Sequence, residues 1–252
     1  MTIADLFNPK NNAATAAAAL AMQAANMKKG KSFDQCKCID FLLGVPEEGD
    51  QKKKGGCMKG GKTGWTIEDY NRHVQGLVDS LDLKNRAISK IGLDESQISE
   101  IPPILLTSYS RKGDGIYTKW EGNKYVTNKY SVTWIFFSAT QLYTYTYILD
   151  TISDDSVETT RDFFYSDITC IRTEHEIEER IYEVNDKGCL AQIKALFKPT
   201  EAKYVHNNIH WDTLQITVPN DSYSFCCRTN DLASMEQSIQ AAKAMIREKK
   251  QA

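Results

Sequence analysis

A glycine- and lysine-rich octapeptide, GCMKGGKT at residues 56–63, fits the phosphate-loop pattern G-x-x-x-x-G-K-[ST]. In nucleotide-binding proteins such a loop joins a buried strand to a helix, and its Lys and hydroxyl residue contact phosphate and magnesium. Lys62 and Thr63 would take these roles here. The preceding residues, EEGDQKKKGG, lack the composition of a buried strand, so we expect residues 56–63 to be part of a linker. Nucleotide binding through Lys62 and Thr63 is the alternative.

Three cysteines, Cys36, Cys38 and Cys57, lie close enough in the sequence to form a thiolate metal site. Structural zinc sites need four ligands and usually present paired C-x-x-C spacings. The spacing here is C-x-C, and His73 is the only nearby candidate for a fourth ligand. We therefore expect reduced thiols, with no metal and no cofactor, and a metal held by these cysteines is the alternative.

The four histidines, His73, His175, His206 and His210, form no recognisable catalytic pattern. No nucleophile elbow or zinc-binding helix motif includes any of them. His206 and His210 are four residues apart, but the two asparagines between them predict a loop. We therefore expect no catalytic residues and a protein that is not an enzyme.

A basic and aromatic stretch, RKGDGIYTKWEGNKYVTNK, begins at residue 111 and is predicted to be a long loop between strands. Long loops between strands often carry function. Asp114 and Glu121 dilute its positive charge. Its candidate residues for a partner or ligand are Arg111, Lys112, Lys119, Trp120, Lys124 and Lys129.

Composition sets wider limits on function. The chain has 252 residues, of which 41% are hydrophobic and 25% charged, as expected for a globular protein with a real core. Its net charge of −2 gives no overall attraction to nucleic acid. The first residues lack the pattern of a secretory signal, so we expect a cytoplasmic protein.

The first hundred residues are predicted to be helical, with one flexible interruption. Residues 1–30 contain an Ala-rich helix, and residues 31–64 form a flexible Gly- and Lys-rich segment. Within that segment, SFDQCKCIDFLLGVP is an apolar island that could be a short helix or strand. Residues 65–101 are helical, with a near capping box from Thr66 to Asp69. A second helix of this region covers 83–91.

The second half is predicted to be β-rich, because its runs of β-branched and aromatic residues alternate with period two. The expected strands cover residues 104–109, 130–138, 141–150, 163–173, 176–184, 212–219 and 222–228. The period changes to 3.6 after Asn230, which predicts a helix over 231–249. Its buried stripe is expected to include Leu232, Met235, Ile239 and Ile246.

The stretches FFYSDITCI, LQITVPNDSYSFCCR and SIQAAKAMIREKK resemble those of bacterial proteins of unknown function with a pleckstrin-homology-like (PH-like) domain. This resemblance implies an α+β protein, with an N-terminal helical segment followed by an antiparallel PH-like sandwich or barrel over 102–252, capped by a C-terminal helix. The corresponding loop of phosphoinositide-binding PH domains supplies basic residues. The resemblance therefore implies an alternative function, anionic-lipid binding through the 111–129 loop and contact with a membrane.

The function that we expect is that of a non-enzymatic binding or scaffold module acting through protein–protein contacts. Its partner would be another protein or a second copy of the chain. The Ala-rich helix permits close approach to a neighbour, and the segment 109–130 is rich in Tyr and Trp. These aromatic residues are favoured at protein interfaces because they combine a large apolar area with a polar tip.

Overall fold

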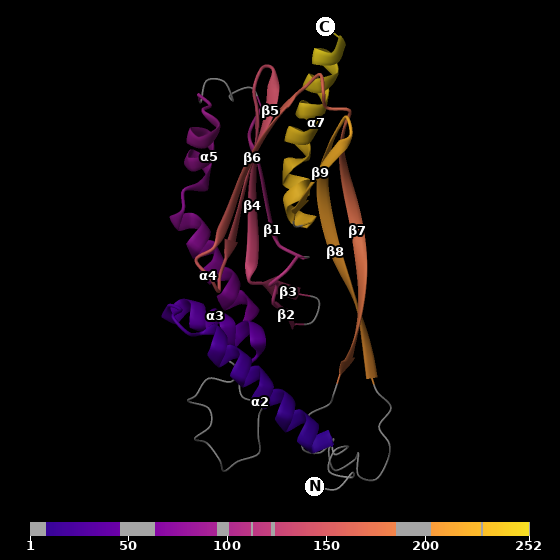
Figure 1. Ribbon diagram of the computed structural model, residues 1–252. Coiled ribbons are helices and arrows are strands. Elements are labelled where there is room, and N and C mark those ends of the chain that lie inside the picture. The colour runs from indigo at the N-terminus through magenta and orange to yellow at the C-terminus, as the bar shows by residue number, and fades with distance from the viewer. Residues whose placement is uncertain are drawn as a thin grey trace.

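A computed structural model describes most of the chain, and all structural statements below concern these parts. They are residues 9–45, 64–94, 101–111, 113–121, 124–184, 203–227 and 229–251. The described chain is an α+β protein: four helices precede nine antiparallel strands, and one long helix follows them (Figure 1). Lys62, Thr63, Cys57 and Lys112 lie outside the described residues.

Two of the four described N-terminal helices begin at capping residues that the sequence supplies. Ser32 and Thr66 each accept a hydrogen bond from the backbone N–H three residues later, and Gln35 and Asp69 return it, so both helix starts are capping boxes. The near capping box predicted at Thr66 is therefore confirmed, and the apolar island after residue 31 is a helix. The helices are α2 (Pro9–Met27), α3 (Phe33–Leu43), α4 (Ile67–Ser80) and α5 (Leu83–Ile91).

The first large sheet is a four-stranded antiparallel meander in the order β1-β4-β5-β6. Its strands are β1 (Ile104–Tyr109), β4 (Lys129–Phe137), β5 (Gln141–Asp150) and β6 (Ser156–Phe164). The strand predicted over 163–173 is wrong. Phe163 and Phe164 end β6, and a turn follows in which Tyr165 and Ile168 are buried. Sequence reasoning missed β6 because an edge strand paired on one side tolerates its polar composition.

The second sheet is a three-stranded meander in the order β7-β8-β9. Its strands are β7 (Cys170–Val184), β8 (Lys203–Val218) and β9 (Asp221–Cys227). Two predictions are corrected. The sequence predicted two strands with a break before residue 176, but β7 is one continuous strand. It also predicted a loop at His206–His210, but these residues belong to β8. Fifteen consecutive residue pairs hold β8 against β7, and this pairing outweighs the turn preference of the asparagines.

The predicted loop over 111–129 contains a small hairpin. Its strands are β2 (Thr118–Glu121) and β3 (Lys124–Thr127), which pair antiparallel. Asn128 follows the hairpin and is fully buried. Its side chain accepts from the Tyr117 N–H at 2.7 Å and donates to Gly115 O and Asp150 Oδ1. The hairpin is thereby held on the end of the first sheet.

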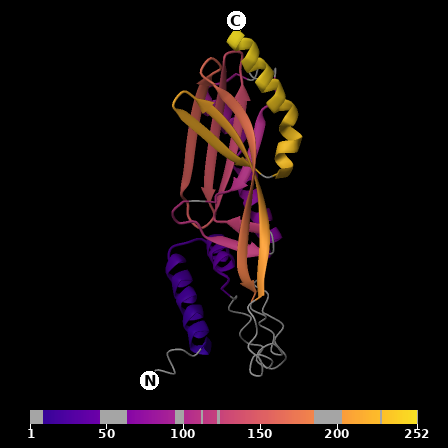
Figure 2. The ribbon, with the colours of Figure 1, turned by 90° about the vertical axis from the view of Figure 1, so that its right-hand side faces the viewer.

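Both faces of the first sheet are covered. Tyr145, Phe136 and Val132 face a core shared with α3, α4 and α5, whereas Ile135 and Leu142 face a second core shared with β8, β9 and α7. The sheet is thus the middle layer between the N-terminal helices and the second sheet (Figures 1 and 2). This arrangement explains why β4 is a nearly continuous apolar run.

The C-terminal helix α7 (Thr229–Gln251) lies against this second core. Ile239 and Ile246 are buried, as predicted from the apolar stripe. The structure does not describe the side chains of Leu232 and Met235.

Candidate functional site

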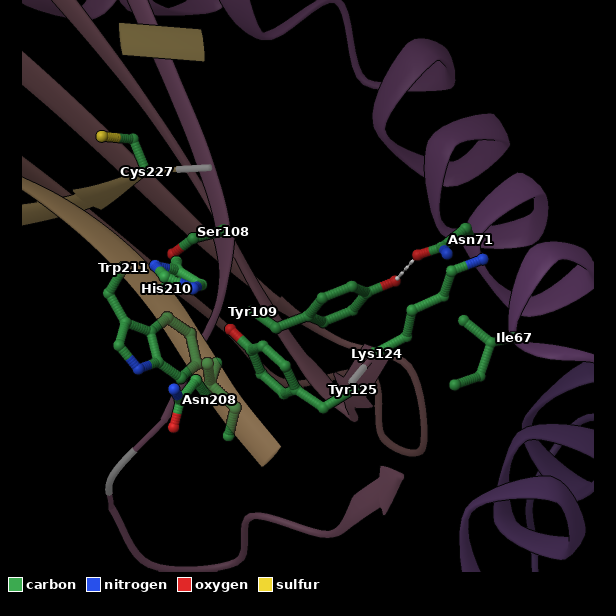
Figure 3. Close-up of a pocket in the computed structure, with 11 residues that line it drawn as sticks. Ile67, Asn71, Ser108, Tyr109, Lys124, Tyr125, Asn208, His210, Trp211 and Cys227 are labelled. Carbon is green, nitrogen blue, oxygen red and sulfur yellow. Dashed lines mark hydrogen bonds between the residues drawn. The ribbon is translucent and has the colours of Figure 1, made fainter. Parts of the chain in front are cut away.

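A cleft of about 340 Å³ opens where β1, the β2–β3 hairpin, α4 and β8 meet. Its walls come from segments far apart in the sequence (Figure 3). Its lining residues are Ile67, Asn71, Ser108, Tyr109, Lys124, Tyr125, Asn208, Ile209, His210, Trp211 and Cys227.

Aromatic rings form the floor of the cleft. Tyr125 stands edge-on to Trp211, with 4.6 Å between ring centroids, and stacks on Trp120 at 5.1 Å. Tyr109 is edge-on to Tyr125, with 6.2 Å between ring centroids. It donates its hydroxyl hydrogen to Asn71 Oδ1 at 2.7 Å. Figure 3 shows Tyr109 and Tyr125 side by side between β8 and α4. Three aromatic residues of the 109–130 stretch, Tyr109, Trp120 and Tyr125, thus lie together here, and Tyr109 is itself buried.

Arg111 packs on Trp211, one of the residues that line the cleft. Its guanidinium lies 3.8 Å from the centroid of the Trp211 ring and 3.0 Å from a carboxylate oxygen of Glu178. Arg111 Nε and Trp211 Nε1 are both buried, and neither donor has an acceptor among the described residues. A buried donor without an acceptor costs roughly 1–3 kcal/mol, so the ring and charge contacts of Arg111 must offset this cost.

The basic residues of the proposed ligand site that the structure describes are engaged by the chain itself. Lys124 Nζ lies 2.7 Å from Glu68 Oε1, and this contact lowers the pKa of Glu68. Lys129 Nζ donates to the Asp114 carbonyl at 2.9 Å, and Lys119 Nζ lies over the Phe41 ring. Anionic-lipid binding would have to compete with each of these contacts.

Three histidines lie on one face of the β7–β8 ladder, and two of them, His175 and His210, contact each other. His175 Nδ1 is 2.7 Å from Asp212 Oδ1, and His175 Nε2 is 3.1 Å from His210 Nδ1. His206 Nδ1 is 2.7 Å from Glu179 Oε1. Sequence reasoning missed this cluster because residues 206–210 were interpreted as a loop. Residues four apart in a strand share one face, so the spacing of His206 and His210 was the available signal.

The described thiols give no support to a metal site. Burial raises the pKa of the Cys38 thiol to about 12, so it remains protonated and is a poor ligand. No group of three His, Cys, Asp or Glu residues within the described ranges could hold a metal ion. His73 packs on Trp65, 5.2 Å between ring centroids, and burial lowers its pKa.

Comparison with protein-family models gives no match, and comparisons with curated proteins and with solved structures give no significant match. None of the helices in the part of the chain that the structure describes is long and apolar enough to cross a membrane.

Proposed function

We propose that this chain is a non-enzymatic binding module whose PH-like β-domain, residues 102–252, recognises another protein through the aromatic cleft. The strand order supports the PH-like assignment: a meander of four strands is followed by a meander of three and a C-terminal helix. The sequence resemblance implies antiparallel strands followed by one C-terminal helix. We also propose that the protein is bacterial and cytoplasmic.

The observation that carries the proposal is the Trp120–Tyr125–Trp211 aromatic contact at an open cleft. Aromatic rings supply large contact areas at low entropy cost, and they are enriched where proteins meet. The charged side chains at the cleft are paired internally, as in Lys124 with Glu68 and Arg111 with Glu178. Such a surface favours a partner that offers apolar side chains over a strongly charged small molecule.

Self-association is a second candidate, supported by a different surface. Met22 on α2 and Phe33 on α3 are 70% and 74% exposed. An apolar patch formed by such side chains would be a contact site, and the small residues around Met22 would permit close approach.

The proposal can be tested by site-specific photocrosslinking in the cell that makes this protein. A benzophenone amino acid replaces Trp120 at the rim of the cleft, and a matched chain carries it in place of Phe164. Phe164 is exposed on β6, away from the cleft lining. We expect a discrete protein adduct from position 120 that is absent from position 164. Equal labelling from both positions, or none, would contradict the proposal.

A further inference from the structure

Strand β8 is much longer than its neighbour β9. β9 pairs with β8 only over Asp212–Val218, whereas β7 pairs with β8 along its whole length, from Lys203 to Thr217. Before Asp212, one edge of β8 therefore has no strand partner among the described residues. The long β7–β8 ribbon extends well beyond β9 (Figure 2).

The backbone groups at this open edge can be assigned by alternation. The Thr169 N–H donates to the Thr217 carbonyl at 2.8 Å from the β7 side, so Thr217 directs its backbone groups toward β7. Val218, paired with Asp221 across a two-residue turn, directs its groups toward β9. Successive residues alternate between the two sides. The backbone groups of the even-numbered residues of β8 thus face β9. Beyond the end of β9, His210 and Asn208 direct their N–H and C=O groups outward.

The open edge lies in the wall of the aromatic cleft. Asn208 and His210 line this cleft together with Cys227, the last residue of β9. Ser108 and Tyr109, at the end of β1, line its other side. Tyr125 lies between β8 and α4, and its ring meets that of Trp211 on β8 (Figure 3). A row of backbone donors and acceptors therefore runs beside an apolar floor, in line with β9.

We propose that an extended segment of a partner protein adds to β8 beside Asn208 and His210 and continues the line of β9. This inference rests on the proposed function and names its ligand class. An added strand would satisfy backbone groups that repeat every two residues, about 6.7 Å apart. Its central side chain is uncharged and apolar or aromatic and lies against Tyr125 and Trp211, because the charges at the cleft already have partners.

Full-length protein is panned against a phage-displayed library of random dodecapeptides, and the enriched peptide is synthesised and titrated. His210→Pro and Asn208→Pro each remove one N–H that faces the cleft. Ile177→Pro is the matched control: Ile177 pairs directly with His210 but directs its N–H to the outer edge of β7. Proline is tolerated where the N–H faces away from the ladder. We expect a loss of at least tenfold in affinity for His210→Pro and Asn208→Pro, and less than threefold for Ile177→Pro.

Amide exchange on the unmodified protein gives a second measurement that needs no folded variant. Bound peptide should slow the exchange of the Asn208 and His210 amides and leave Ile209, already bonded to β7, unchanged. Peptide binding without this protection, or with equal losses in all three variants, overturns strand addition while the proposed function stands. If no peptide is enriched but a protein adduct forms at position 120, strand addition is likewise overturned and the proposed function stands. No enriched peptide and no adduct overturns both.

Discussion

The guanidinium of Arg111 lies 3.8 Å from the centroid of the Trp211 ring, and its side chain is only 15% exposed. Arg111 follows β1, whereas Trp211 belongs to β8. The contact therefore joins the end of the first sheet to the long ribbon of the second. It also holds the indole of Trp211, which lines the aromatic cleft.

We expect Arg111→Ala to destabilise the protein by about 2 kcal/mol, because a desolvated cation–π contact is worth about that much. Arg111→Lys should recover less than half of this, since Lys keeps the charge but cannot stack or bind Glu176 and Glu178 in the same way. Urea unfolding of the three proteins gives the free energies. A loss of less than about 0.5 kcal/mol in Arg111→Ala would contradict this role.

A second prediction concerns Glu158, which ties α5 to the first sheet. Hydrogen bonds from Arg86, Lys90 and Tyr145 lower its pKa to about 2. A carboxyl whose pKa is lower in the folded state stabilises the protein above its unfolded pKa of about 4.3, and this contribution is lost as the pH falls toward 2. The unfolding free energy of the wild type should therefore exceed that of Glu158→Gln at pH 5, and the difference should shrink by pH 2.5.

The comparison must separate this effect from the general loss of negative charge. Asp162→Asn removes an exposed carboxylate from the same strand, β6, and serves as the control. A constant difference between wild type and Glu158→Gln from pH 5 to pH 2.5 would show that the three hydrogen bonds contribute nothing measurable.

The elements with strong local signals could be predicted from the sequence. The bounds of α5 and β1 match the prediction, because Gly92 ends the helix in the left-handed region at φ 77° and prolines precede the strand. Strand β6 and the first half of β8 have no such signal. Their residues are polar, and they are strands because β5 and β7 supply hydrogen-bonding partners.

The candidate site could be predicted only in part for the same reason. Trp120, Tyr125 and Tyr109 lie within one stretch, so composition alone drew attention to them. Trp211 is nearly ninety residues from Tyr125 in the sequence. The two rings meet through sheet packing and strand register, which no local pattern specifies. The pairing of Lys124 with Glu68 is equally non-local. Side-chain types thus predicted a contact surface, but not that its charges were already neutralised.

The buried stripe of α7 gives a third prediction. Ile239 is 1% exposed and packs in the core shared by both sheets. Ile239→Ala should cost about 2–5 kcal/mol, as expected for a large-to-small change in a core. Gln240→Ala, at the exposed neighbouring position, should change stability by less than about 0.5 kcal/mol. Thermal and urea unfolding of both variants measure the difference, and equal costs would contradict the packing of α7.

A fourth prediction uses thiol reactivity to follow the N-terminal core. Cys38 is fully buried, and burial raises its thiol pKa to about 12. Because the thiolate is the reactive form, iodoacetamide at pH 8 should alkylate exposed Cys170 long before Cys38. Peptide mass spectrometry over time distinguishes the two sites. Equal rates in native protein would mean that α3 does not stay docked on the first sheet.

The last prediction tests whether α2 serves contacts instead of the core. Within the side chains of α2 that the structure describes, Ala24 is buried and Met27 is partly buried, whereas Leu20 and Met22 are exposed. Deleting residues 1–30 also removes the ion pair of Lys28 with Asp40. Losing one small buried side chain and this partly buried pair should cost about 1–3 kcal/mol.

The shortened chain should therefore keep the far-ultraviolet circular dichroism of its strands and a cooperative unfolding transition. Since deletion removes two exposed apolar side chains, sedimentation should give a smaller assembly than the full chain if α2 mediates self-association. Leu20→Ser with Met22→Ser in the full-length protein is the matched control, because it removes the same apolar surface and leaves Ala24 in place. Unfolding of the β half on deletion would make α2 part of the core. If all three proteins sediment as monomers, each with the mass of its own chain, self-association through α2 is excluded.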